Sequence, residues 1–417
     1  MTPIRQATGS RLAARTVALD AEVDLADIAG DHGILWEAGD GSGMAGWGAA
    51  ARIAVPLGAG TAAEDVVAGL GAIHCDGPRP PVALGALPFS SSERGELVVP
   101  AVLVRREADG SCWLTVTESD PALSAVDEVR RRVVASRRQP ENDAPRDYRV
   151  RSSMEQGAWR QMVAGAAEAV VAGRFAKVVL AREVTVEADR PLRPSEVARR
   201  LRLSHPSCMV FSVDGFVGAS PELLVERHGD RVRSQPLAGT VARTGSPGHQ
   251  DELVAWLLSS DKERQEHRLV VDAVAGALRS YCDELSVPEV PALVPVGTLA
   301  HLGTLISGRL AERSTTVLEL VDAIHPSPAV GGTPTGAALA YIAAVEGLDR
   351  GRYAGPVGWV DAEGDGCFAV GIRSAQIEGN RARLMAGVGV VAGSDPDAEL
   401  AETELKLQPM LGALIRP

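Results

Sequence analysis

The stretch FAKVVLAREVTVE, residues 175–187, has the composition and alternation of a buried β-strand. β-Branched residues recur through it, and side chains two positions apart lie on the same face of a strand. Phe175, Lys177 and Val179 are therefore expected on one face. Burial disfavours the charged form of a lysine, and the neutral amine that results can act as a general base. The alternative is an edge-strand lysine that prevents aggregation.

A glutamate follows in the stretch FVGASPELLVERHGDRVRSQPLAGT, residues 216–240, which predicts a hairpin turning at residues 228–230. Glu222 comes directly after Pro221, which indicates a strand edge or a bulge, and apolar residues follow it. A carboxyl group in apolar surroundings has a raised pKa and can donate a proton. The alternative is an exposed strand glutamate.

Two further stretches predict helices, SSDKERQEHRLVVDAVAGAL at 259–278 and SDPDAELAETELKLQPML at 394–411. Ser260 or Asp261 would cap the first, and Ser394 or Asp395 the second. Each helix carries two glutamates spaced i, i+3 and so on one face, namely Glu263 with Glu266 and Glu399 with Glu402. Two such faces could enclose a hard divalent cation, and carboxylate oxygens favour Mg²⁺. The alternative for each is a solvated acidic face.

A glycine-rich strand, ARLMAGVGVVAG, precedes the second helix. Its GxGxxxG spacing is not the dinucleotide fingerprint, which argues against NAD. Arg373 lies among apolar residues in what we interpret as a strand, and a buried arginine generally pairs with an anion. Together these segments predict a small carboxylate-bearing substrate with one base, one acid and a metal ion.

Composition narrows the class of protein. The 417 residues are 45% hydrophobic and 23% charged, which predicts a folded chain, and the net charge is −12 without a basic stripe, which argues against nucleic-acid and anionic-membrane partners. Of 42 cationic residues only three are lysines, Lys177, Lys262 and Lys406, which makes them candidates for positions where arginine will not serve. The alternative for each is mutational chance. Five scattered cysteines and the absence of a signal core or a long apolar run predict a soluble, cytoplasmic protein.

The chain changes character after its first third. Residues 1–145 predict hairpins and short helices, with strand pairs in ILWEAGDGSGMAGWGAAARIAV and ELVVPAVLVRREADGSCWLTVT. Residues 137–153 are interpreted as a linker or exposed crossover, and helical spacing of apolar residues follows over 155–174. The predicted division is a variable N-terminal portion, 1–145, and a catalytic region, 146–417.

The ordered series KVVLAR, SPELL, PLAGT, KERQEH, HLGT, IHPSPAVGG, YAGPVG, IRSA, AGVGVVAGS and ETELKL resembles the chorismate-utilising enzymes related to anthranilate synthase component I. The resemblance covers about residues 150–417. It implies an α+β fold with two large antiparallel sheets in a sandwich-like core flanked by helices. The active site would lie between them.

The resemblance also implies residue roles. Lys177 matches the base of members that use water as the nucleophile, and Glu222 matches the acid. Glu266 and Glu402 would bind Mg²⁺ directly, supported through water by Glu263 and Glu399. The substrate would lie among Gly239, Thr240, His301, Ala329, Tyr353, Arg373, Gly387, Gly389 and Lys406.

These matches point to isochorismate synthase activity on chorismate. The alternatives are a salicylate synthase, whose members tend to have threonine near Ala329, and a chorismate-binding module without turnover. The stretches AARTVALD and GWGAAARI are most similar to actinobacterial menaquinone-pathway members. We expect a monomer that feeds menaquinone or siderophore biosynthesis and has no nucleic-acid or membrane partner.

Overall fold

The computed structural model describes residues 5–6, 12–58, 62–118, 123–135, 144–242 and 255–415. Within them, strands form two large sheets and one small sheet, antiparallel throughout except where β2 pairs with β6. The largest has thirteen strands, in the order β11 (Tyr148–Ser152), β12 (Lys177–Ala188), β26 (Arg381–Val390), β25 (Ser374–Glu378), β14 (Phe216–Ser220), β13 (Met209–Val213), β3 (Ile34–Glu37), β4 (Gly43–Trp47), β9 (Val102–Arg106), β10 (Cys112–Glu118), β2 (Ala13–Ala18) and β6 (His74–Asp76), with β22 (Gly332–Thr333) beside β12.

The second large sheet also draws strands from both ends of the chain. Its ten strands are β1 (Arg5–Gln6), β5 (Ala51–Pro56), β8 (Arg94–Val99), β7 (Val82–Ala86), β23 (Pro356–Asp361), β24 (Gly366–Val370), β15 (Leu223–His228), β16 (Arg231–Gln235), β21 (Ile306–Leu310) and β18 (Cys282–Ser286). The small sheet comprises β17 (Leu237–Ala242), β20 (Leu299–Gly303) and β19 (Ala292–Val296).

An apolar core joins the two large sheets. Trp36 and Phe211 of the thirteen-stranded sheet pack in one cluster with Leu84 and Val357 of the ten-stranded sheet. Because side chains alternate along a strand, neighbouring residues such as Val360 face the other side, where a separate cluster packs against helices. This arrangement confirms the predicted sandwich-like α+β core.

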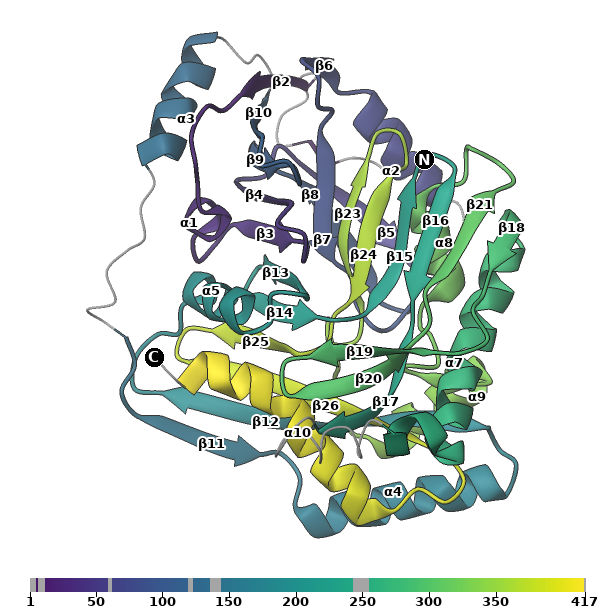
Figure 1. Cartoon of the computed structure of the whole chain (residues 1–417). Helices are drawn as coiled ribbons and strands as arrows, with labels where there is room; N and C mark the ends of the chain where they lie inside the picture. The colour runs from purple at the N-terminus through teal and green to yellow at the C-terminus, as the bar shows by residue number, and fades with distance from the viewer. Residues whose placement is uncertain are drawn as a thin grey trace.

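Helices cover the outer faces of the sandwich (Figure 1). In Figure 1, α10 lies along β26 and contacts α4 and α5, whereas α7 and α8 lie beside the ten-stranded sheet. The helices are α1 (Leu25–Ala29), α2 (Ala62–Gly71), α3 (Leu123–Ala135), α4 (Gln156–Val171), α5 (Pro194–Ser204), α7 (Asp261–Arg279), α8 (Val317–Ile324), α9 (Thr335–Val345) and α10 (Pro396–Ile415). No helix among the described residues is both long and apolar enough to span a bilayer.

The predicted elements around the site are present. Strand β12 occupies most of the predicted strand at 175–187, the β15–β16 hairpin turns at residues 228–230 as expected, and the two acidic stretches form α7 and α10. Ser260 caps α7 by accepting a hydrogen bond from the amide of Glu263. Asp395 caps α10, because its carboxylate accepts from the amides of residues 397 and 398.

Three local predictions are wrong. Residues 148–152 of the expected linker form β11, which pairs with β12, while residues 137–143 lie outside the described residues. Phe175 precedes β12 and packs in one cluster with Val178 and Leu180, so it does not share the face of Lys177. Arg373 lies between β24 and β25 with φ of 51°, not within a strand.

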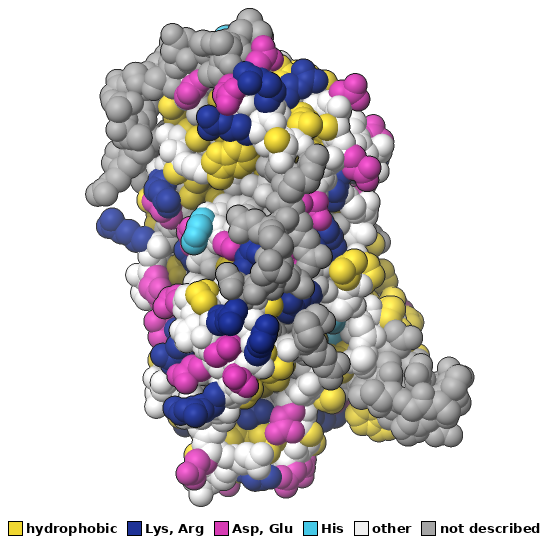
Figure 2. All heavy atoms as spheres, turned by 90° about the vertical axis from the view of Figure 1, so that its left-hand side faces the viewer, with side chains coloured by type: hydrophobic (Ala, Val, Ile, Leu, Met, Phe, Trp, Pro, Cys, Tyr) yellow, Lys and Arg dark blue, Asp and Glu magenta, His cyan; other side chains and the backbone are white. Residues whose placement is uncertain are grey.

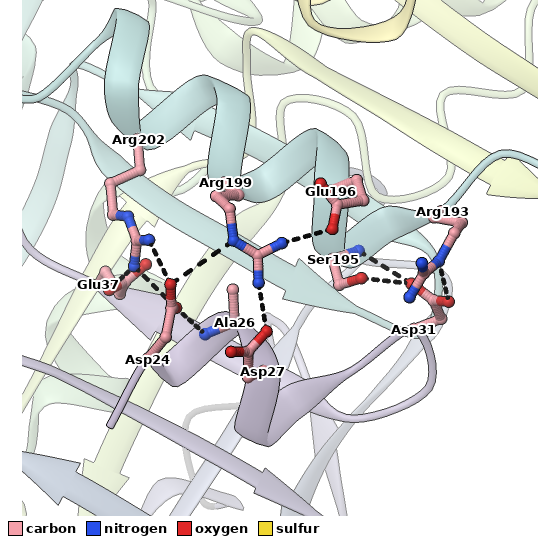
Figure 3. A network of polar contacts seen from close by, with 10 residues as sticks. All are labelled: Asp24, Ala26, Asp27, Asp31, Glu37, Arg193, Ser195, Glu196, Arg199 and Arg202. Carbon is pink, nitrogen blue, oxygen red and sulfur yellow. Dashed lines mark hydrogen bonds and ion pairs between the residues drawn. The ribbon is translucent and has the colours of Figure 1, made fainter. Parts of the chain in front are cut away.

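Polar contacts tie the N-terminal portion to α5 (Figure 3). Arg199 contacts Asp24 and Asp27 around α1, and Arg202 contacts Asp24 and Glu37. Although burial alone would raise it, the hydrogen bond and charge of Arg202 lower the pKa of Asp24 to about 2. On the face shown in Figure 2, acidic and basic side chains are interspersed.

Candidate active site

A cavity lies where β12, β26, the β14–β15 connection and the small sheet meet, beside α7 and α10. All the predicted site residues line it except Glu263 and Glu399, which are buried and contact Lys262. The lining residues that the sequence predicted are Lys177, Glu222, Gly239, Thr240, Glu266, His301, Ala329, Tyr353, Arg373, Gly387, Gly389, Glu402 and Lys406.

Lys177 begins β12 and is only 1% exposed. Its Nζ lies 2.8 Å from Oε1 of Glu266 on α7. A Cβ at Gly389, on the paired strand β26, would come within 2.1 Å of that same Glu266 oxygen, so only glycine leaves room for the pair. The edge-strand interpretation of this lysine is therefore wrong.

The chain's three lysines all converge on the acidic faces of α7 and α10. Besides the Lys177–Glu266 pair, Lys262 Nζ lies 2.9 Å from Glu399 Oε1 and 3.7 Å from Glu263 Oε1, so it bridges the two helices. Lys406 Nζ lies 2.6 Å from Glu402 Oε1. Each of the four predicted metal ligands thus has a lysine partner, and the solvated-face interpretation is wrong.

Three lysines face four glutamates in this acidic cluster. Burial and repulsion from Glu266 raise the pKa of Glu263 to about 7, and burial and repulsion from Glu402 raise the pKa of Glu399. A divalent cation would relieve this repulsion, and carboxylate oxygens are the ligands that Mg²⁺ prefers. Among the described residues, a group of three acidic side chains with ligand oxygens within 4.8 Å of one another occurs at Asp361, Glu363 and Asp365, and not among these glutamates. The donor chemistry of the four glutamates suits Mg²⁺, and their use as ligands stays a prediction.

Glu222 lies on the chain between β14 and β15, where the strand pairing shifts register. Burial raises the pKa of its carboxyl to about 7, although a backbone hydrogen bond from Leu237 and the charge of Lys177 act in the opposite direction. The predicted raised pKa is present, so this carboxyl holds a proton near neutral pH while facing the cavity.

Arg373 is buried without a carboxylate in hydrogen-bond contact. Its Nη2 lies 3.4 Å from Nε2 of His301, and its Nε has no hydrogen-bond partner. Burial and the charge of Arg373 hold the pKa of His301 well below its usual range, so the imidazole is neutral. With Nε2 accepting from Arg373, Nδ1 carries the proton and donates to the carbonyl of Gly239 at 3.2 Å. A buried guanidinium with a free donor is suited to an anionic ligand.

A second glycine of β26, Gly387, also lines the cavity. A Cβ at Gly387 would lie 3.2 Å from the hydroxyl of Tyr353, whose pKa burial raises to about 12. Lys406 donates to the carbonyl of Gly387 at 3.0 Å, and Thr240 bonds to Glu402. The glycines predicted as substrate contacts thus also make space for the polar groups around them.

The sequence predicted no site role for two residues that contact the site, Lys262 and Arg350. Lys262 was singled out only by the scarcity of lysine, and its bridge between α7 and α10 is visible only in the folded chain. Arg350 lines the cavity and pairs with Glu346, which lies four residues earlier in the chain. No role was predicted for either residue. The i, i+4 spacing of opposite charges was the available signal.

The fold and the cavity define the class. A sandwich of two antiparallel sheets encloses a buried lysine, a buried glutamate with a raised pKa and two acidic helix faces. The family described as chorismate binding enzyme matches residues 83–415. This chain belongs to that family.

Several named isochorismate synthases are similar to this chain over most of its length. Isochorismate synthase DhbC of Bacillus subtilis is 39% identical over 345 residues, covering 80% of this chain and 81% of that protein. The putative isochorismate synthase MenF of Mycobacterium tuberculosis is 42% identical over 347 residues, covering 80% and 86%. The menaquinone-specific isochorismate synthase MenF from Escherichia coli has a similar structure, with a TM-score of 0.82 and 25% identity, over 100% of this chain and 96% of that one.

Proposed function

We propose that this protein is an isochorismate synthase, which converts chorismate reversibly to isochorismate. Relatives named for this activity match most of the chain at about two residues in five. The observation that carries the proposal is that Lys177 and the protonated Glu222 face one buried cavity with Arg373, whose Nε is free to bind an anion. These groups supply a base, an acid and a carboxylate clamp.

The chemistry exchanges one hydroxyl for another. The neutral amine of Lys177 takes a proton from a water molecule, whose oxygen forms a bond to C2 of the ring. The ring double bonds shift, the bond from C4 to its hydroxyl oxygen breaks, and Glu222 gives that oxygen a proton, so water leaves. The product is an isomer of the substrate, and the reaction can therefore run in both directions.

Substrate binding falls to cationic groups and the acidic cluster. Arg373 and Lys406 would hold the carboxylates of chorismate, and Ala329 would line the space for the side chain of the ring. We propose that Glu266 and Glu402 hold Mg²⁺ directly and that Glu263 and Glu399 support it through water. The ion would neutralise the ring carboxylate and fix its orientation.

Incubation of the purified protein with chorismate and Mg²⁺, followed by chromatography, tests the activity. We expect isochorismate, approaching the same mixture when the reaction starts from isochorismate. Salicylate with pyruvate would instead identify a salicylate synthase. Binding of chorismate without any product would identify a module that lacks turnover.

We further propose that the protein works as a monomer in the cytoplasm and supplies isochorismate for menaquinone or siderophore synthesis. Two structural relatives support these pathways, the menaquinone-specific enzyme from E. coli and a putative 2,3-dihydroxybenzoate-specific isochorismate synthase from Bacillus anthracis, with a TM-score of 0.79 and 32% identity. Light scattering gives the oligomeric state. Complementation of strains lacking either pathway enzyme distinguishes the two fates.

A further inference from the structure

A buried ion pair stands beside the strand that carries Lys177. Glu346 ends α9, and Arg350 follows four residues later, with side chains only 1% and 3% exposed. Arg350 Nε donates to Glu346 Oε1 at 2.7 Å, and its Nη2 donates to Oε2 at 2.6 Å. This two-bond geometry fixes the plane of the guanidinium.

The remaining donors of Arg350 reach two backbone carbonyls on the cavity wall. Nη2 donates to the carbonyl of Val179 in β12, and Nη1 donates to the carbonyl of Val330, both at 2.8 Å. Phe89 lies against the guanidinium, 4.4 Å from ring centroid to the central carbon. Arg350 thus has no need of a ligand, although it lines the cavity.

The Glu346–Arg350 ion pair bonds to backbone groups of β12 at a point where this strand has no neighbouring strand on one edge. On the edge away from β26, this strand pairs with β22 at residues 177–178 and with β11 at residues 184–188. Between these segments the carbonyl of Val179 meets Arg350, and the amide of Ala181 donates to Glu346 Oε2 at 2.9 Å. The ion pair therefore satisfies backbone groups that a continuous strand would otherwise bind.

We propose that the Glu346–Arg350 ion pair is a positioning device, which holds Lys177 and the Ala329 loop, residues 326–331, at fixed places across the cavity. The proposal rests on the proposed function. Arg350 binds Val179, two residues beyond the base, and Val330, one residue beyond Ala329. The amide of Val179 also donates to the carbonyl of Gly331, so the strand and the loop are linked directly as well as through Arg350.

The test compares Arg350→Lys with Arg227→Lys. Arg227 is a matched control, because it is equally buried, pairs with Asp365 at 2.6 Å and donates to the carbonyls of Glu363 and Arg313, but it lies outside the cavity. Lysine keeps each charge and loses the planar set of donors. We expect Arg350→Lys to lower kcat about 100-fold with KM within about twofold, because misplacing a catalytic group slows the chemical step. Arg227→Lys should leave kcat within about threefold of the wild type.

Equal losses of kcat in the two variants, or a raised KM with unchanged kcat in Arg350→Lys, would overturn the proposal. If Arg350→Lys fails to fold, Glu346→Gln replaces it with the same expected kcat and KM changes, because one acceptor oxygen becomes an NH₂ group that faces an N–H donor of Arg350 or of Ala181.

Hydrogen exchange separates this proposal from the proposed function. The amide of Ala181 should exchange faster in Arg350→Lys and Glu346→Gln than in the wild type, whatever the product of the enzyme. Unchanged exchange at Ala181 would reject the positioning role. A wild-type protein that makes no isochorismate would reject only the proposed function.

Discussion

At the scale of single residues, the choice of lysine over arginine marks the active site. The chain has three lysines among 42 cationic residues, and all three contact the acidic cluster between α7 and α10. Guanidinium remains protonated in proteins, whereas an ammonium can lose its proton and presents a compact charge. The site needs those properties, because Lys177 is proposed to cycle between its two protonation states.

Lys177→Arg should therefore lower kcat by at least about 100-fold, or about 2.7 kcal/mol, although it keeps the positive charge. Guanidinium cannot accept the proton from water. Steady-state kinetics with chorismate measure the change, and Arg309→Lys, an exposed substitution on β21, serves as the control. More than a tenth of the wild-type kcat would exclude Lys177 as the base.

Glu222 should set the alkaline limit of activity. Its pKa is about 7 because of burial, and the group donates a proton only in its protonated form, so kcat/KM should fall as the pH rises through about 7. A profile of kcat/KM between pH 5 and 9 measures this fall. Circular dichroism identifies the part of this pH range in which the wild type stays folded. Glu222→Gln should be inactive throughout. A profile that stays flat above pH 7 would contradict the acid role.

Ala329 should leave the product as isochorismate, with little pyruvate. Elimination of pyruvate needs the enolpyruvyl group held in a reactive conformation, and a methyl side chain has neither hydroxyl nor bulk to hold it. A difference of a few kcal/mol between the two barriers is enough, since about 1.4 kcal/mol corresponds to tenfold in rate. A coupled lactate dehydrogenase assay, with chorismate as the only substrate, measures the rate at which pyruvate is released. Pyruvate released as fast as chorismate disappears would identify a salicylate synthase.

At the scale of elements, the contact of α1 with α5 joins the N-terminal portion to the rest of the fold (Figure 3). Arg199 is central to it, with its side chain 10% exposed and its guanidinium facing Asp24, Asp27 and Glu196. Removing one partner of a buried charge pair leaves the others uncompensated. Arg202 also pairs with Asp24, so Arg199 strengthens the contact without being its sole support.

Arg199→Met should destabilise the protein by about 3 kcal/mol, because the largely buried carboxylates of Asp27 and Glu196 each lose an ion pair with Arg199, whereas Asp24 keeps its pair with Arg202. Urea unfolding followed by circular dichroism measures the change in the free energy of unfolding. Arg52→Met is the control, because Arg52 and Glu96 form an exposed pair worth less than about 1 kcal/mol. Equal effects of the two substitutions would show that the α1–α5 contact contributes nothing special.

At the scale of the whole molecule, two helices far apart in the sequence supply the acidic cluster. Helix α7 packs on the small sheet, and α10 lies along β26. Residues of both helices and of β12 line the cavity. Burial, followed by repulsion from Glu266 on the same helix, raises the pKa of Glu263 to about 7. A bound cation would therefore stabilise the fold as well as the substrate.

Removal of metal with EDTA should stop turnover, and Mg²⁺ should restore it. Mg²⁺ should also raise the melting temperature of the substrate-free protein, since a ligand that binds only the folded state stabilises it. Glu266→Gln and Glu402→Gln should reduce both effects, whereas Glu96→Gln on β8 should change neither. Full activity of a metal-stripped sample would reject the metal site.

The sequence alone determined the elements and the chemistry they carry. Alternating β-branched residues predicted the strand at Lys177, and capping residues with i, i+3 glutamates predicted α7 and α10, because these signals are local. The apolar neighbours of Glu222 made a raised pKa one of two alternatives, and its burial in the fold decided between them. The division of the chain at residue 145 stays a prediction.

Only the tertiary structure decided which of these groups meet. The Lys262 bridge, the left-handed conformation of Arg373 and the backbone contacts of Arg350 depend on segments as many as 171 residues apart. A linear pattern records the type of a side chain but not the partner that packing brings to it. Burial, which sets the protonation of Glu222 and the need for glycine at Gly389, arises only when the sheets and helices close around the cavity.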